Sequence, residues 1–448
     1  MRPGENVELR LDGFAAGGQG VGRVAGRALF VPFTLPGERV SARVVHVGRR
    51  KVSGRVEKIL EPSPDRVVAP CPVFGKCGGC QLMHASYGRQ LELKKTILFD
   101  ALKSIANYVP ASGLEVVAAP EPLAYRNRGQ YPVARDISGT LTGFYSARSH
   151  EVVAAERCLI HDRRIDEAVA CVRAWANRKK VPVYNEKRHS GWLRHVAVRV
   201  GTGTGELQLC LVVRDGRRVA HRDLLRRLRR RVPFLSGLVV NVNPAPTNVI
   251  FGRESKVLWG QPRLREDFCG LKLELGPQTF FQVNAQQAQR VFSMVTKFME
   301  PLDGALVDAY CGAGVLAMLL AREGHTVIGM ESNREAVEDA RRAVKDNRID
   351  GVEIIHGRVE KELPRLGGAK PSPCGVVLDP PRKGCAPEVL EALAAGGVSR
   401  VAYMSCHPGT LARDLSRLFE LGYRLERLEA VDMFPQTAHL EVFAGLCA

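Results

Sequence analysis

The chain has 448 residues, more than one ordinary core accommodates, so two or three domains are expected. Its 45% hydrophobic and 25% charged residues are typical of a soluble globular protein, and no apolar stretch reaches the roughly 18 residues that span a bilayer. The start lacks the apolar segment of a secretory signal, which favours a cytoplasmic protein. The net charge of +18 indicates a polyanionic partner, although solvated arginines on a helix face such as 222–232 would also contribute.

Residues 1–62 alternate short strand patterns with glycine turns. Apolar residues recur at near-period-two spacing, which predicts a small β-barrel of the oligonucleotide-binding type. The basic segment "RVVHVGRRKVSGRV" would follow a phosphate backbone. The alternative is a barrel that only packs on its neighbour.

A Pro-rich linker, "EPSPDRVVAPCP", leads into a region that we interpret as a central α+β domain, 63–265. A polar helix is predicted near 86–106, and it could pack on the catalytic domain. The segment "YRNRGQYPV" (125–133) alternates cationic and aromatic residues. It is either a surface that stacks bases and contacts phosphates or the interior of a strand.

Three cysteines gather in the glycine-rich segment "CPVFGKCGGC": Cys71, Cys77 and Cys80. A structural zinc site more often pairs one C-x2-C knuckle with a second, and only one occurs here. A lone distant cysteine must therefore complete four ligands, and Cys158 is the best candidate. This asymmetry favours an iron–sulfur cluster in a structural role, with zinc as the alternative.

From residue 266 onward, strand and helix patterns alternate as in a parallel doubly wound sheet. The segment "GALVDAYCGAG" ends a buried strand in a turn where Gly312 and Gly314 allow close approach of a cofactor, and Glu331 follows about twenty residues later. This pattern fits both a nicotinamide dinucleotide and S-adenosylmethionine. A later strand ends in Asp379 and two prolines, which favours a methyltransferase that acts on a planar ring.

Six motifs together resemble the RNA (uracil-C5)-methyltransferases, which form 5-methyluridine in ribosomal RNA and tRNA. They are "CPVFGKCGGC", "FFQVN", "DAYCGAG", "DPPRKG", "SCHPGTLARD" and "MFPQTAHLEVFAGL". The resemblance covers nearly the whole chain and includes the first barrel, which resembles a TRAM domain. It implies a Rossmann-like class I S-adenosylmethionine-dependent methyltransferase domain over 266–448, and a [4Fe–4S] cluster on the four cysteines.

The resemblance also implies the catalytic residues. Carbon C5 of uracil is too weak a nucleophile to attack a methylsulfonium, so a thiolate first adds to C6 and a base later removes the C5 proton. Cys406 matches the nucleophile and Glu441 matches the proton acceptor. Cys385 is a rival thiol, but the family places the nucleophile after the following strand.

The expected contacts with S-adenosylmethionine are carried over in the same way. They are Gln282, Tyr310, Gly312, Gly314, Glu331 and Asp379. Two positions depart from the family: Val315 replaces a residue that is often polar, and Arg358 stands where an Asp or Asn usually meets the adenine. Neither residue is expected to be a ligand.

The N-terminal barrel and the cysteine cluster favour 23S ribosomal RNA as the substrate, with the T-loop of tRNA as the alternative. A target uridine inside an RNA stem would have to be flipped out to reach a buried thiol. The chain is expected to act as a monomer. A nicotinamide-dependent reductase and a non-catalytic RNA-binding protein on a methyltransferase fold are the remaining alternatives.

Overall fold

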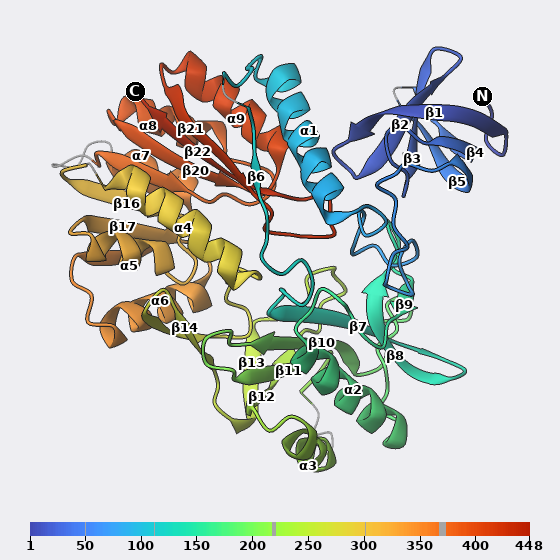
Figure 1. Ribbon diagram of the computed structural model, residues 1–448. Helices are drawn as coiled ribbons and strands as arrows, with labels where there is room; N and C mark the ends of the chain where they lie inside the picture. Colours follow the sequence, from blue (N-terminus) through green and yellow to red (C-terminus); the bar gives the residue numbers. More distant parts are fainter. Residues whose placement is uncertain (50, 112, 217–220, 301, 367–372) are drawn as a thin grey trace. The chain divides into compact units, whose positions relative to one another are not determined.

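Figure 1 shows the computed structural model, which describes residues 1–49, 51–111, 113–216, 221–300, 302–366 and 373–448. The chain divides into two compact units. Unit 1 comprises Met1–Pro122, Cys406–Ser416 and Glu429–Val442. Unit 2 comprises Leu123–Ser405, Arg417–Leu428 and Phe443–Ala448. The C-terminal part of the chain therefore contributes to both units.

Unit 1 begins with a closed barrel of strand order β1-β2-β3-β5-β4. Its strands are β1 (Asn6–Ala15), β2 (Gln19–Val24), β3 (Arg27–Pro32), β4 (Arg39–Val47) and β5 (Val52–Glu61). Alternate residues point inward, and Leu11, Leu29 and Val40 are among those that fill its core. The small barrel predicted from the period-two pattern is confirmed.

Unit 1 also contains the helix predicted near 86–106, which is α1 (Tyr87–Ile105). Ser86 caps its N-terminus, because the Ser86 hydroxyl accepts from the backbone N–H of Arg89 at 3.4 Å. Leu93 and Ile97 on α1 pack in one apolar cluster with Phe14 of the barrel. The same unit holds β6 (Val116–Val117), which pairs in parallel with Ala430 and Val431.

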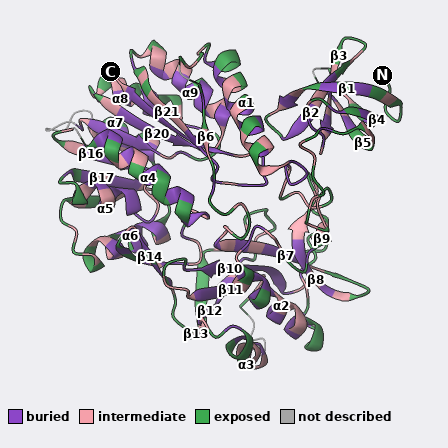
Figure 2. Cartoon of the chain, viewed as in Figure 1, coloured by how far each residue is buried: buried purple, intermediate pink, exposed green. Residues whose placement is uncertain are grey.

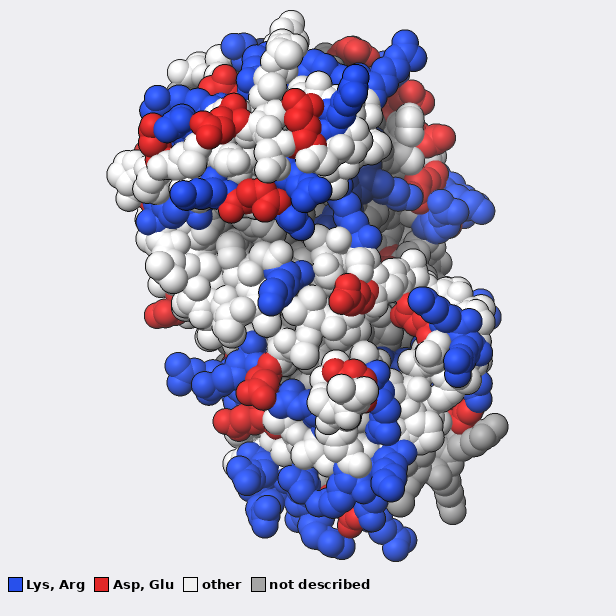
Figure 3. All heavy atoms as spheres, turned by 90° about the vertical axis from the view of Figure 1, so that its right-hand side faces the viewer, with Lys and Arg blue, Asp and Glu red and all other residues white. Residues whose placement is uncertain are grey.

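Unit 2 contains a sheet of strand order β13-β12-β11-β10-β7-β8-β9. Its strands are β7 (Arg128–Asp136), β8 (Gly139–Tyr145), β9 (Val152–Ala154), β10 (Leu193–Val200), β11 (Leu207–Val213), β12 (Leu235–Val242) and β13 (Glu254–Gly260). Helices α2 (Arg163–Arg178) and α3 (Arg222–Arg231) cover one face of this sheet. In α3, Leu224 and Leu228 are fully buried while the arginines face outward, as the sequence predicts (Figure 2). Lys and Arg side chains gather at the lower end of the face that Figure 3 shows.

The doubly wound sheet expected after residue 266 has strand order β18-β17-β16-β19-β20-β22-β21-β6. Most of it belongs to unit 2, while β6 and parts of β21 and β22 belong to unit 1. The strands are β16 (Ala305–Ala309), β17 (Thr326–Glu331), β18 (Val352–His356), β19 (Gly375–Leu378), β20 (Arg400–Ser405), β21 (Arg424–Val431) and β22 (Glu441–Cys447). The connecting helices are α4 (Ala285–Met299), α5 (Val315–Arg322), α6 (Arg334–Asp346), α7 (Val359–Leu366), α8 (Pro387–Ala395) and α9 (Pro408–Glu420). A short antiparallel pair, β14 (Leu264–Phe268) and β15 (Leu271–Leu275), precedes α4.

The order of the parallel strands fixes where a ligand can bind. Strand β16 pairs in parallel with β17 on one side and with β19 on the other. The chain winds outward in both directions from β16, so the crevice beyond the carboxyl ends of β16 and β19 is the expected binding position in this fold. Among the described helices, none combines the length and the apolar character that crossing a bilayer requires.

Candidate functional site

The turn after β16 is shaped by residues with positive φ angles. Tyr310, Gly312 and Gly314 have φ of 67°, 55° and 73°. Glycine suits the last position, because a Cβ on Gly314 would lie 3.1 Å from the Cβ of Ala340. Tyr310 adopts the same left-handed conformation although its side chain makes that conformation strained. Strained backbone of this kind is concentrated at functional sites.

Two carboxylates hold this turn in place. Asp308 accepts from the backbone N–H of Ala317 at 3.0 Å, and Glu331 accepts from the N–H of Gly312 at 3.2 Å. Glu331 also accepts from the N–H of Asn333 at 2.6 Å. The Glu331 carboxylate therefore lies beside the glycine turn at the end of β17, as expected, and part of its accepting capacity stabilises the turn itself.

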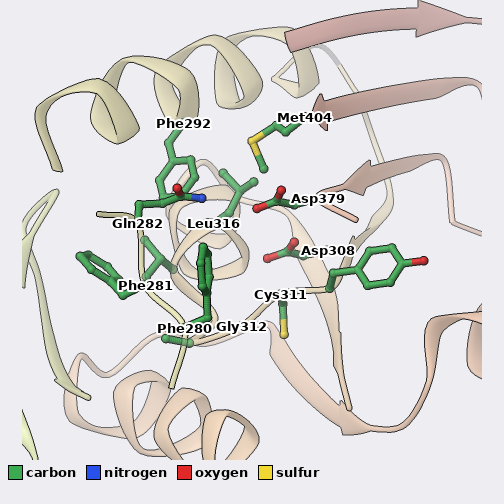
Figure 4. Close-up of a pocket in the computed structure, with 13 residues that line it drawn as sticks. Phe280, Phe281, Gln282, Phe292, Asp308, Cys311, Gly312, Leu316, Asp379 and Met404 are labelled. Atoms are coloured by element: carbon green, nitrogen blue, oxygen red, sulfur yellow. The ribbon is translucent and has the colours of Figure 1, made fainter. Parts of the chain in front are cut away.

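A pocket lies beyond the ends of β16 and β19, and we call it the strand-end pocket (Figure 4). It brings together four of the residues predicted as cofactor contacts: Gln282, Tyr310, Gly312 and Asp379. Its apolar walls include Phe280, Phe281, Phe292, Leu316 and Met404. Its cavity volume is only ≈ 40 Å³, little more than the space of one water molecule. Phe280, which is 59% exposed, forms the outermost part of the apolar wall.

One wall of the strand-end pocket is the segment 276–284, which carries Phe280 and Gln282. Asn127 and Arg128, at the start of strand β7, hold this segment. The side-chain amide of Asn127 donates to the carbonyl of Gln282 at 3.0 Å, and the Arg128 guanidinium donates to the carbonyl of Pro277 at 2.7 Å. Because these partners are backbone atoms, the hold does not depend on the side chains of the segment.

Strand β10 and helix α6 hold the same segment at two more points. Arg199, which is 5% exposed, donates to the carbonyls of Gly276 at 3.2 Å and of Thr279. Asp339 accepts from the backbone N–H of Gly276 at 2.8 Å and from the Thr279 hydroxyl at 2.5 Å. The pocket wall is thus braced by four residues: Asn127, Arg128, Arg199 and Asp339. No motif or spacing in the sequence predicts this role.

The strand-end pocket is acidic, and burial changes how its acids titrate. Burial is the main cause, and the nearby Asp379 carboxylate the second, of a pKa of Asp308 raised to about 8. Burial likewise raises the pKa of Asp379 to about 7. Burial also raises the pKa of the Cys311 thiol, with added repulsion from Asp308 and Glu331. Such a site favours a cationic ligand, because a positive charge stabilises the ionised carboxylates. Sequence analysis missed Asp308, although its place at the end of a buried strand in "VDAYCGAG" was a usable signal.

The predicted catalytic residues both belong to unit 1. Cys406 is half-buried and lies directly between β20 and the first turn of α9. His407 caps that turn, since its Nδ1 accepts from the N–H of Thr410 at 3.2 Å. The N-terminal end of a helix favours negative charge, so the position suits a thiolate. Glu441, the first residue of β22, is 5% exposed and therefore largely shielded from water.

The other residues weighed from the sequence are also placed. Cys385 is 5% exposed. Val315 lines the strand-end pocket with an apolar side chain, while Arg358 is 64% exposed and pairs with Glu360 at 3.5 Å. In the segment 125–133, Arg128 braces the pocket wall and Tyr131 is 2% exposed, so the strand-interior interpretation is right for these two residues.

The cysteine segment does not show an assembled metal site. Within the described part of the chain, no three His, Cys, Asp or Glu residues form a group that could hold a metal ion. Cys71, Cys77 and Cys80 lie in unit 1, and Cys158 lies in unit 2. The Gly79 N–H donates to the Cys77 sulfur at 3.4 Å, which is the contact expected of a glycine-rich loop folded around thiolates. None of the described cysteines forms a disulfide.

Comparisons with known proteins agree with this geometry. The family described as tRNA (Uracil-5-)-methyltransferase matches residues 271–447, and the TRAM domain family matches residues 2–56. An uncharacterized RNA methyltransferase of Halalkalibacterium halodurans is 39% identical over 98% of this chain and 96% of its own length. An uncharacterized RNA methyltransferase of Nostoc sp. is 40% identical over 99% of this chain and 96% of its own.

A solved structure extends the similarity to the three-dimensional fold. It is the tRNA (uracil-54, C5)-methyltransferase of Pyrococcus abyssi in complex with S-adenosyl-L-homocysteine. That protein is 28% identical, with a TM-score of 0.79 over 98% of this chain and 99% of its own. With a TRAM barrel, a doubly wound domain and full-length relatives, the chain belongs to the uracil-C5 family of RNA methyltransferases.

Proposed function

We propose that this enzyme transfers the methyl group of S-adenosylmethionine to C5 of a specific uridine in RNA, through a covalent adduct of Cys406. The observation that carries the proposal is the strand-end pocket, which joins Gln282, Tyr310, Gly312 and Asp379 at the switch point of the sheet. The solved relative binds S-adenosyl-L-homocysteine, the product of this cofactor. The acidic pocket suits its positively charged sulfonium.

In the proposed reaction the Cys406 thiolate forms a bond to C6 of uracil, and the electron pair of the C5–C6 double bond moves onto the ring as an enolate. C5 of the enolate then attacks the methyl group, and the methyl–sulfur bond breaks to leave S-adenosylhomocysteine. Glu441 takes the proton from C5, and the thiolate departs as the double bond re-forms. A shielded carboxylate such as Glu441 suits this last step, because water competes less for its lone pairs.

The substrate RNA has two candidates, and we propose 23S ribosomal RNA as the first. This choice rests on the resemblance of the N-terminal barrel and the cysteine segment to enzymes of that type. The T-loop of tRNA is the second candidate, because the solved relative acts on uracil-54 of tRNA. In either case the net charge of +18 suits the chain to binding a polyanion. We also propose that the reaction takes place in the cytoplasm and that the enzyme acts as a monomer.

We further propose that Cys71, Cys77, Cys80 and Cys158 are the thiolates that bind a [4Fe–4S] cluster in a structural role. The Gly79 N–H that is directed at the Cys77 sulfur supports this choice, since backbone donors to ligand sulfurs are typical of such clusters. Iron and sulfide analysis of anaerobically purified protein tests it, with Cys80→Ser expected to lose iron. Stoichiometric zinc in place of iron would overturn the assignment.

The methylation proposal is tested with purified enzyme, labelled S-adenosylmethionine and unmodified transcripts of 23S ribosomal RNA and tRNA. Wild type is expected to form 5-methyluridine at one site, and Cys406→Ala is expected to form none. Cys385→Ala is the matched control, because it removes a thiol that the proposed reaction does not use. Full turnover by Cys406→Ala would overturn the mechanism, and methylation of the tRNA alone would move the target to tRNA.

A further inference from the structure

Unit 2 contains a second hollow that shares no residue with the strand-end pocket. Its cavity volume is ≈ 530 Å³, which is within the usual range for small-molecule sites. It lies where β7, the β8–β9 hairpin, β10 and the segment 184–187 meet. Its walls include Tyr145, His150, Tyr184, Glu186, Arg194 and His195. We call it the β7–β10 hollow.

Both aromatic rings and cations line this hollow. The Arg194 guanidinium lies over the Tyr184 ring at 4.4 Å from its centre. The rings of Tyr145 and His150 lie 5.1 Å apart at an interplanar angle of 33°. Arg135 and Lys187, both exposed, add positive charge at the rim. Rings that stack bases beside cations that pair with phosphates are what proteins use to hold single-stranded nucleic acid.

The same hollow is also lined by polar groups that can form hydrogen bonds with the edge of a base. Glu186 accepts from the Tyr145 hydroxyl at 3.0 Å and interacts with Nδ1 of His150 at 2.8 Å, so its carboxylate is held in a fixed orientation. His195 is 7% exposed, and its Nδ1 has no hydrogen-bond partner among the described residues. Burial lowers the pKa of His195 to about 4, so the ring is neutral at pH 7. A buried polar atom without a partner in the protein is a place where a ligand can supply one.

The β7–β10 hollow opens on the same face of the sheet as the residues that brace the strand-end pocket. On β10, the side chains of Val196, Val198 and Val200 point into the core beneath α2 and α3. His195 and Arg199 have the opposite parity, so they share the other face. Arg199 holds the pocket wall 276–279, and His195 lies four residues away, which is about 13 Å along a strand.

The facing strand repeats this arrangement. In the antiparallel register, Pro132 lies opposite His195 and Arg128 lies opposite Arg199. Arg128 holds the pocket wall, and Ala134, two residues beyond Pro132, lines the hollow. One rigid pair of strands therefore connects the hollow with the wall of the strand-end pocket, and a flexible strand of RNA could contact both.

We propose that the β7–β10 hollow receives one unpaired nucleotide of the RNA substrate, distinct from the target uridine. Its base stacks on the Tyr145 and His150 rings, its edge meets Glu186 and His195, and its phosphate lies near Arg135 and Lys187. The inference rests on the proposed function, because it takes the substrate to be RNA. Binding of this nucleotide in the hollow would fix the distance between a flanking base of the RNA and the site of methyl transfer.

The test uses the full-length enzyme with unmodified transcripts of 23S ribosomal RNA and tRNA. Tyr145→Leu removes the stacking ring and Lys187→Ala removes an exposed charge. Tyr145→Leu is expected to raise the dissociation constant and the KM for RNA about tenfold, the scale of one base–aromatic stack. Its kcat and its affinity for S-adenosylmethionine should stay within twofold of wild type. Tyr145→Phe should recover most of the RNA affinity, because the stacking ring remains and only the hydrogen bond to Glu186 is lost.

The matched control is Lys180→Ala, an exposed lysine after α2, the helix that covers the opposite face of the sheet. It should leave RNA binding unchanged. Ultraviolet cross-linking followed by mass spectrometry should place RNA on peptides that contain Tyr145 or Tyr184. The inference would be overturned if Tyr145→Leu and Lys187→Ala both bound RNA with wild-type affinity, or if the cross-links lay only on other surfaces. A protein partner would then be the next occupant to test.

The outcomes also separate this inference from the proposed function. If wild type binds a transcript but forms no 5-methyluridine, the proposed function fails, and the dissociation constants still decide the hollow. If wild type methylates RNA and the variants are unaffected, only the hollow fails. If wild type binds neither transcript, both are overturned.

Discussion

Asp308 and Asp379 come from the ends of neighbouring parallel strands, β16 and β19, and their carboxylates line one pocket (Figure 4). The two strands are the pair at which the sheet changes winding direction. The fold thus places two acids where a methyl donor with a positive sulfur is expected to bind. Their electrostatic properties lead to the first prediction.

Affinity for S-adenosylmethionine should rise with pH between about 6 and 9. The pKa values of Asp308 and Asp379 are raised to about 8 and about 7, so both acids are protonated at pH 6 and ionised at pH 9. The ionised forms attract the sulfonium, whereas S-adenosylhomocysteine has a neutral sulfur and should bind with a flatter profile. Isothermal titration of both ligands across this range measures the difference, and Asp308→Asn should reduce the slope. Identical profiles for the two ligands would contradict the prediction.

Arg128→Met should raise the KM for S-adenosylmethionine about tenfold or more with a smaller effect on kcat. The substitution removes the donor to Pro277 and loosens the wall that carries Phe280 and Gln282. Arg128→Lys should recover part of the loss, because an ammonium can still donate to one carbonyl. Steady-state kinetics checks this, with Arg226→Met on the exposed face of α3 as the control. A drop in stability without a change in KM would show that Arg128 only supports the fold.

Glu441→Gln should slow turnover at least about 100-fold and accumulate a covalent enzyme–RNA adduct. The amide keeps the shape of the side chain but cannot take the C5 proton, so the reaction stops after methyl transfer. Denaturing gel electrophoresis with labelled RNA reveals the adduct as a shifted band. The double variant Cys406→Ala/Glu441→Gln should lose that band. An unshifted gel from Glu441→Gln with normal product would show that another group removes the proton.

Lys94→Met should lower the free energy of unfolding by about 3–5 kcal/mol, because it leaves the buried carboxylate of Asp432 without its cation. Both side chains of this pair are fully buried, and Asp432 also accepts from the Tyr87 hydroxyl at 2.9 Å. Chemical denaturation measures the loss, and adding Asp432→Leu should recover part of it. For comparison, Arg334→Ala at an exposed pair with Glu338 should cost less than about 1 kcal/mol. Equal effects of the two single substitutions would contradict the prediction.

The sequence determined the elements that depend on local pattern. The period-two spacing and glycine turns of the first barrel, the leucine spacing of α3 and the alternation of strands and helices after residue 266 all reappear in the structure. The residues Gln282, Tyr310, Gly312 and Asp379 were also named from motifs, and one pocket unites them. Motifs at strand ends are predictable in this way because a parallel sheet brings the carboxyl ends of its strands to one edge.

The tertiary structure decided which side chains those elements meet. Asp308 became part of the strand-end pocket because β16 lies at the switch point of the sheet, and Arg128 became a brace because the start of β7 contacts the segment 276–284. The segment 125–133 fits an RNA surface and a buried strand equally well until its neighbours are known. Burial, hydrogen-bond partners and the raised pKa values of two acids all arise from contacts between residues far apart in the chain. No local pattern encodes them, so they could be read only from the folded molecule.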